Sequence, residues 1–129
     1  AYKTIIERKD YKTLKAIPGK LLILSGEDKG KMLDLMGSSD AEGTALVIGR
    51  DAPDYKNMIP PELKIVDTSS TVSRNQDKII AKAGKLYIKN NTENNHTIVD
   101  GKVLTINEEV ELKNSAVIKM GFLELKYQK

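Results

Sequence analysis

Three short polar segments carry the side chains that could bind a phosphate group attached to a peptide. They are residues 48–50 (Ile-Gly-Arg), 73–76 (Ser-Arg-Asn-Gln) and 91–101, which is rich in asparagine. The planar guanidinium of arginine suits paired, charge-assisted hydrogen bonds to phosphate oxygens. A carboxamide both donates and accepts, so it can bind the backbone of an extended peptide. Two of only three arginines, Arg50 and Arg74, lie in these segments, which indicates a binding module.

Short strands must position these segments, because apolar residues recur in brief alternating runs between turn residues. Leu86 and Ile88, for example, alternate with polar neighbours as in a half-buried strand. Asp100-Gly101 is a strong hairpin signal, since both residues accept the positive φ angles of a type I′ turn. We expect strands at 21–25, 31–36, 45–48, 63–66, 78–82, 85–89, 109–112, 116–120 and 122–127, with the hairpin at 99–102.

This pattern predicts an all-β fold, an antiparallel two-sheet β-sandwich of about eleven strands with its binding loops at one end. No convincing amphipathic helix of ten or more residues is present. Residues 51–62, which contain three prolines, are expected to form a long loop beside Arg50.

The chain has 129 residues, 40% of them hydrophobic, which is enough for one modest core. We divide it into an extension or linker at 1–20 and a domain at 21–129. No cysteine is present, so disulfides and thiolate metal sites are excluded. No apolar run approaches the ~18 residues that span a bilayer, and we expect a cytoplasmic location. The sequence begins at Ala1 and not at a methionine, so it is compatible with a longer chain that carries a neighbouring domain, or a targeting or membrane segment.

The charge pattern and the residue types argue against nucleic-acid binding and catalysis. The net charge of +3 comes from 21 basic and 18 acidic residues that alternate along most segments, whereas nucleic-acid binding usually needs a concentrated basic stripe. The single histidine, His96, lies in an asparagine-rich loop without a nucleophile motif, and no glycine-rich phosphate loop is present. We expect no catalytic residues, no metal and no cofactor.

The ordered set of segments resembles the forkhead-associated (FHA) domain family. That family's signatures are a leucine-rich first hairpin, Ile-Gly-Arg, Ser-Arg-x-His, Asn-Gly-Thr-x-Val-Asn-Gly and a closing Ile-x-x-Gly strand pair. The corresponding residues here are 21–36, 48–50, 73–76, 95–101 and 118–121. Each fragment alone is weak, but the set in this order is specific. The resemblance implies a sandwich whose loops at one end bind phosphothreonine peptides.

The resemblance also implies roles for five residues. Arg50 and Ser73 are expected to donate hydrogen bonds to the phosphate, and Arg74 to add a second cation. Asn95 matches the asparagine that binds the peptide backbone beside the phosphoresidue, and Asn94 stands where many members carry a threonine near the phosphate.

Each role has a purely structural alternative. Arg50 could form a surface salt bridge with Asp51 or Asp54. Ser73 could bond its own backbone in a turn, and the asparagines could simply favour loop conformations.

Two glycines have expected structural roles, and two residues depart from the family pattern. Gly49 is assigned to close backbone approach and Gly101 to the hairpin turn. Gln76 replaces the family's loop-supporting histidine, and His96 replaces the glycine after the central asparagine.

The function expected is a noncatalytic phosphothreonine-recognition module that mediates protein–protein interaction in signalling or assembly. Its partner is a phosphothreonine-containing protein or peptide, with no nucleic acid and no membrane contact. The Gln76 and His96 departures motivate the alternative, a degenerate FHA-like domain acting as a phosphate-independent structural or assembly module.

Overall fold

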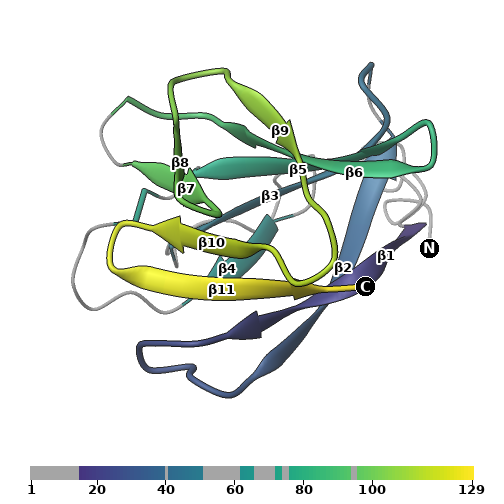
Figure 1. Cartoon of the computed structure of the whole chain (residues 1–129). Coiled ribbons are helices and arrows are strands. Elements are labelled where there is room, and N and C mark those ends of the chain that lie inside the picture. The colour runs from purple at the N-terminus through teal and green to yellow at the C-terminus, as the bar shows by residue number, and fades with distance from the viewer. Residues whose placement is uncertain (1–14, 40, 51–61, 66–71, 74–75, 94–95) are drawn as a thin grey trace, which may run out of the picture.

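The computed structural model describes residues 15–39, 41–50, 62–65, 72–73, 76–93 and 96–129, with the backbone alone at 50 and 62–65. These residues form eleven β-strands and no helix (Figure 1). The strands are β1 (Lys15–Ile23), β2 (Met32–Ser39), β3 (Thr44–Arg50), β4 (Glu62–Ile65), β5 (Asp77–Lys82), β6 (Lys85–Asn90), β7 (Thr97–Val99), β8 (Lys102–Leu104), β9 (Glu109–Glu111), β10 (Val117–Met120) and β11 (Leu123–Gln128). Accordingly, none of the described segments is a helix that could cross a membrane.

The strands pair in the order β8-β7-β10-β11-β1-β2-β3-β5-β6-β9, with β4 added beside β3. β2 joins the two layers, because its first part pairs with β1 and its last two residues pair with the start of β3. Gly37 lies at this transition. A Cβ atom there would approach the backbone oxygen of Ala45 to 2.8 Å, so only glycine lets the two strands come this close.

The predicted all-β antiparallel sandwich is confirmed, and each strand expected from the sequence is present. One pairing differs, since β4 runs parallel to β3, from Val47 opposite Glu62 to Arg50 opposite Ile65. β3 pairs with β2 at its start and with β4 further on along the same edge, which leaves its other edge for β5.

The first strand begins at Lys15, within the segment that the sequence interpretation assigned to an extension. A register shift between Ile17 and Lys20 accommodates Pro18 and Gly19, and the strand continues beyond it. Gly19 has a φ of 97°, which a glycine adopts without strain. Residues 15–20 therefore pair within the sandwich, and residues 1–14 lie outside the described part of the chain.

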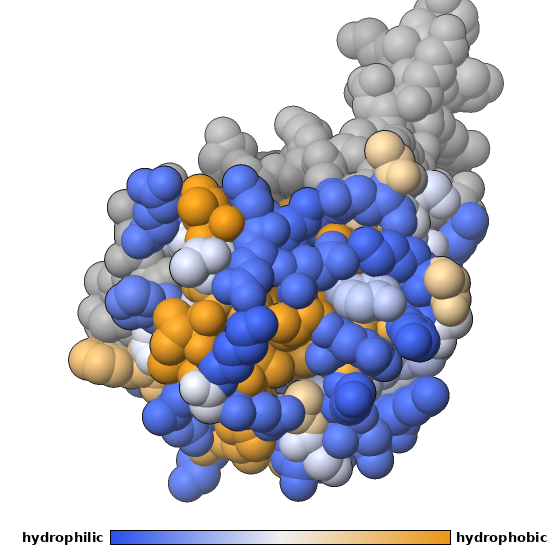
Figure 2. Space-filling view, turned by 45° about the horizontal axis from the view of Figure 1, so that its top comes forward, coloured by the Kyte–Doolittle hydropathy of each residue, from blue (hydrophilic) through white to orange (hydrophobic). Residues whose placement is uncertain are grey.

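The core fills the space between the two layers. Alternation along the strands buries one side of each, as in β11, where Leu123, Leu125 and Tyr127 are buried and the residues between them are partly exposed. Figure 2 shows one face of the molecule, on which hydrophilic residues surround a central group of hydrophobic ones.

Two tight hairpins complete the frame. Asp100 and Gly101 have φ angles of 48° and 85°, the signs that a type I′ turn requires. Ala83 and Gly84 have φ angles of 52° and 76° and close the β5–β6 hairpin in the same way.

Candidate functional site

One row of paired residues brings the three polar segments to the same edge of the sandwich. Ile48 of β3 pairs with Asp77 of β5, and Asp77 pairs with Asn90 of β6. Arg50 therefore lies two residues beyond this row at the end of β3, while the segment 72–76 enters β5 there and the segment from residue 91 leaves β6 there. We call the described loop residues at this edge, 72–73, 76, 91–93 and 96, the rim.

Gln76 ties together the two rim segments that flank it in space. Its side chain is completely buried, and its Oε1 accepts a hydrogen bond from the backbone N–H of Ser73 at 2.9 Å. Its Nε2 donates to Oγ1 of Thr97 at 3.0 Å, at the start of β7. In addition, the Gln76 carbonyl accepts from the backbone N–H of Asn91 at 3.0 Å. The segment containing Ser73 is thus held against both ends of the segment that joins β6 to β7.

This hydrogen-bond series has a fixed direction. A backbone N–H can only donate, so the bond from Ser73 places the oxygen of the Gln76 amide toward it and the nitrogen toward Thr97. The Thr97 hydroxyl accepts from that nitrogen and gives its own proton to Oδ1 of Asp77 at 2.7 Å. The series Ser73–Gln76–Thr97–Asp77 is therefore ordered from the rim into the core.

Asp77 ends the series as a buried carboxyl group. It has no exposed surface, and its Oδ2 has no hydrogen-bond partner among the described residues. Burial raises the pKa of Asp77 from 3.8 to about 7, although the hydrogen bond from Thr97 favours the charged form. Near neutral pH this carboxyl group thus lies close to its midpoint of ionisation.

Asn90 holds the other side of the rim. Its side chain is buried, its Nδ2 donates to the carbonyl of Leu104 at 2.9 Å, and its Oδ1 accepts from the N–H of Thr92 at 3.0 Å. The Asn90 carbonyl also accepts from the N–H of Asn107 at 2.7 Å. The start of the asparagine-rich segment is therefore fixed to the loops around β8.

Comparison with known families gives one decisive match. The family model of the FHA domain matches residues 46–121, more than half of the chain. The chain belongs to the FHA domain family. A comparison with curated protein sequences found no match.

Solved FHA domains share this fold at low sequence identity. The FHA domain of a hypothetical protein of Arabidopsis thaliana is 20% identical, with a TM-score of 0.65 over 92% of this chain and 86% of that one. The FHA domain of the CT664 protein from Chlamydia trachomatis is 21% identical, with a TM-score of 0.61 over 89% and 98%. The MEK1 FHA domain is 15% identical, with a TM-score of 0.59 over 86% and 95%. At these identities the likeness shows the fold alone.

The structure places some of the predicted FHA site residues and leaves others outside the described part. The backbone of Arg50 ends β3, and Gly49 beside it is buried. Ser73 is partly buried in the rim. Three other predicted contacts, Arg74, Asn94 and Asn95, lie outside the described residues.

The two departures from the FHA pattern have different surroundings. Gln76 stands where the family pattern has histidine, and it accepts one hydrogen bond and donates another from its buried side chain. A neutral imidazole has the same pair of capacities, one on each ring nitrogen. His96 is exposed, and its carbonyl accepts from the N–H of Gly121 at 3.2 Å.

The sequence interpretation missed Thr97, Asp77 and Asn90 as supporting residues. All three are polar residues at strand ends, next to segments already singled out. Polar residues that end a strand and border a candidate loop are thus the signal that could have identified them. Among the described residues, no group of three or more His, Cys, Asp or Glu side chains could hold a metal ion.

Proposed function

We propose that this FHA domain is a noncatalytic module that binds phosphothreonine-containing peptides. In this proposal Arg50 and Ser73 donate hydrogen bonds to the phosphate, and Arg74 adds positive charge. Asn95 binds the peptide backbone, assisted by Asn94. The partner is a phosphorylated protein, so the module would link two proteins in signalling or assembly.

The observation that carries the proposal is the pairing of Ile48, Asp77 and Asn90 in one row. Arg50 and Ser73 come from segments that meet at this row, and the segment leading toward Asn94 and Asn95 leaves from it. Residues separated by more than 40 positions in the chain are thereby brought to one edge, as a shared anion site requires.

The buried hydrogen bonds beneath the rim give a second line of support. A loop that is already fixed loses less conformational entropy when a ligand binds, so more of the interaction energy appears as affinity. Gln76 fixes the Ser73 backbone by accepting a hydrogen bond from its N–H.

Membership of the FHA family is a third line of support. The MEK1 FHA domain, which shares this fold, was solved in complex with a phosphothreonine peptide of HOP1. The selectivity of this chain for threonine over serine, and its lack of catalysis, are part of the proposal.

The alternative is a degenerate FHA domain that contacts its partner without phosphate. It rests on the Gln76 and His96 departures. The hydrogen bonds of Gln76 favour the first function, because glutamine here meets the donor and acceptor demands expected of the family's histidine.

The test is a titration, by fluorescence anisotropy, of matched phosphothreonine, phosphoserine and unphosphorylated peptide libraries. We expect binding to the phosphothreonine library alone, and a loss of at least about tenfold in the Arg50→Ala variant, because a charge-assisted bond to phosphate contributes about 1.5–3 kcal/mol. Lys85→Ala, at the far end of β6, is the matched control and should bind normally.

Equal binding of all three libraries would defeat the proposal. Capture of a cellular partner that survives phosphatase treatment would favour the phosphate-independent alternative.

A further inference from the structure

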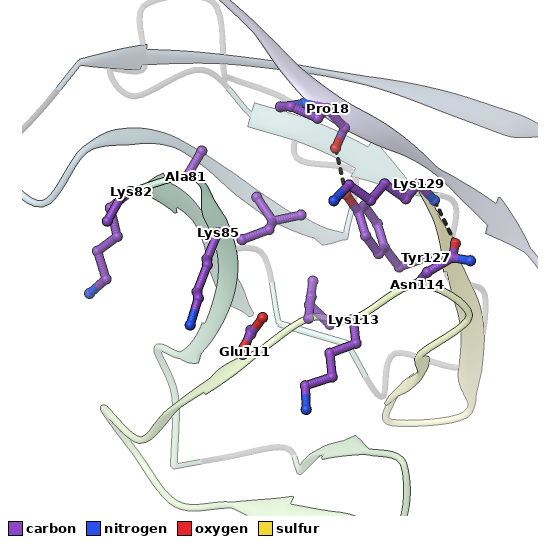
Figure 3. Close-up of a pocket in the computed structure, with 13 residues that line it drawn as sticks. Pro18, Ala81, Lys82, Lys85, Glu111, Lys113, Asn114, Tyr127 and Lys129 are labelled. Atoms are coloured by element: carbon purple, nitrogen blue, oxygen red, sulfur yellow. Dashed lines mark hydrogen bonds between the residues drawn. The ribbon is translucent and has the colours of Figure 1, made fainter.

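A cavity of about 630 Å³ lies at the end of the sandwich opposite the rim. Its lining comes from the β5–β6 turn, the segment that follows β9, the end of β11 and Pro18 of β1 (Figure 3). β5 runs from Asp77 at the rim to Lys82 at the cavity, so at about 3.3 Å per residue the two sites are roughly 17 Å apart. The cavity is therefore a separate feature and does not depend on the proposed peptide binding.

The floor of the cavity is apolar and well fixed. Leu86, Leu112 and Tyr127 line it, and all three belong to the buried core. The Tyr127 hydroxyl donates to the carbonyl of Pro18 at 2.6 Å, which holds the ring in place and satisfies its polar atom. Such a floor favours an apolar ligand body, because contact removes apolar surface from water.

Among the charged residues of the remaining lining, cations predominate. It includes four lysines and a single carboxylate, Glu111. Lys82 is neutralised by Glu109, at 2.8 Å. For the other three lysines, Lys85, Lys113 and Lys129, the described part of the chain offers no carboxylate within ion-pair distance. An anion at this cavity would thus meet three lysines without an ion-pair partner among the described residues, against the single lining carboxylate of Glu111.

Asn114 offers a neutral donor beside these lysines. Its Oδ1 accepts from the backbone N–H of Lys129 at 2.9 Å, which leaves its amide nitrogen to donate (Figure 3).

We propose that this cavity binds a small carboxylate with an apolar body, of the size of a medium-chain fatty acid. The apolar part contacts Leu86, Leu112 and Tyr127, and the carboxylate lies between Lys85 and Lys113. The volume falls within the roughly 300–1,000 Å³ of small-molecule sites, which combine an apolar lining with a few polar groups. An acidic peptide laid along the neighbouring edge strand β9 is disfavoured, because that strand carries Glu109 and Glu111.

The test is an NMR titration of the ¹⁵N-labelled chain with decanoate below its micellar range. We expect amide shift changes at 83–86 and 112–114, with the rim unaffected. Decyltrimethylammonium, which has the same tail and the opposite charge, should leave these amides unchanged. Equal responses to the two amphiphiles, or decanoate shifts located elsewhere, would overturn the proposal.

Two variants separate the contributions of charge and shape. Lys85→Glu combined with Lys113→Glu should weaken decanoate binding by about tenfold or more, because both charges next to the carboxylate are reversed. The control, Lys29→Glu with Lys119→Glu, makes the same change in net charge at exposed positions away from the cavity and should bind normally.

Ala81→Ile extends a lining residue into the cavity and should abolish binding while the thermal transition stays cooperative. If overpacking unfolds this variant, the doubly substituted lysine variant still tests whether the cavity binds decanoate. Unchanged affinity in the doubly substituted lysine variant refutes the site.

Discussion

Asp77→Asn is expected to stabilise the protein at neutral and alkaline pH. The substitution keeps the size of the side chain and an oxygen that can accept from Thr97, and it removes the buried group that ionises. Because the pKa of Asp77 is raised to about 7, the native state holds this proton more tightly than the unfolded state does. Below its unfolded pKa, ionisation of the carboxyl group therefore does not lower the free energy of unfolding. The loss of stability grows as the pH rises from there toward 7.

The magnitude follows from the pKa difference. Each unit corresponds to about 1.4 kcal/mol, so raising the pKa from 3.8 to about 7 gives a cost of about 4 kcal/mol once the native carboxyl group is ionised. Between pH 5 and pH 8 the free energy of unfolding of the wild type should fall by about 3 kcal/mol relative to that of the variant. The unpaired amide N–H₂ offsets part of the gain by about 1–3 kcal/mol, but this offset is the same at both pH values.

Urea unfolding followed by circular dichroism at pH 5, 6.5 and 8 measures the difference between variant and wild type. Subtracting the two removes the contributions of the other titrating groups, provided that the m-values agree. Asp34→Asn is the control, since Asp34 is 78% exposed and should show no such trend. A difference between Asp77→Asn and wild type that stays constant from pH 5 to pH 8 would refute the assignment of a buried, neutral-range carboxyl group.

Three other substitutions test the frame. Gln76→Ala should lower the free energy of unfolding by about 2 kcal/mol and weaken phosphopeptide binding, since the partly buried N–H of Ser73 and the buried hydroxyl of Thr97 each lose a hydrogen bond. Gln76→His should restore both properties in the same assays. Gly19→Ala should cost about 2–4 kcal/mol, because Gly19 has a φ of 97° and a Cβ atom would lie 2.4 Å from the Tyr127 ring; a melting temperature equal to wild type would contradict this. Glu42→Gln should cost about 1 kcal/mol at low salt and less at high salt, because Glu42 bridges two lysines on paired positions of β5 and β6 at 2.7 and 2.6 Å; an effect independent of salt would count against it.

The strands were predictable because their signals are local. In β6 the alternation of Leu86 and Ile88 with polar neighbours fixes both the strand and its buried side. Asp100-Gly101 likewise carries its turn type in the two residues themselves. Such features need no knowledge of the rest of the chain.

The start of β1 was not predictable in the same way. Pro18-Gly19 is typical of a turn that ends a strand, yet β1 continues through these two residues with a shifted register. What stabilises this irregularity is Tyr127, whose hydroxyl binds the Pro18 carbonyl from 109 positions away. A contact at that separation leaves no trace in the local pattern.

The same limit applies to the candidate site. Arg50, Ser73 and the asparagines were predicted from their types, from their order along the chain and from the resemblance to the FHA pattern. The supporting residues Asp77 and Thr97 were not, because the burial of a carboxyl group at a strand end depends on residues that fold over it. Only the assembled rim shows that one hydroxyl group joins Gln76 to Asp77.

The direction of the buried hydrogen-bond series separates the stability of the fold from the geometry of the rim. The backbone N–H of Ser73 can only donate, so the orientations of the Gln76 amide and the Thr97 hydroxyl are set from the rim side. The Thr97 hydroxyl donates to Oδ1 of Asp77, and that oxygen can accept whether or not Oδ2 carries a proton. Ionisation of Asp77 therefore changes the free energy of unfolding without requiring any donor in the series to reverse. It follows that the rim should keep its arrangement throughout the pH range in which the domain stays folded.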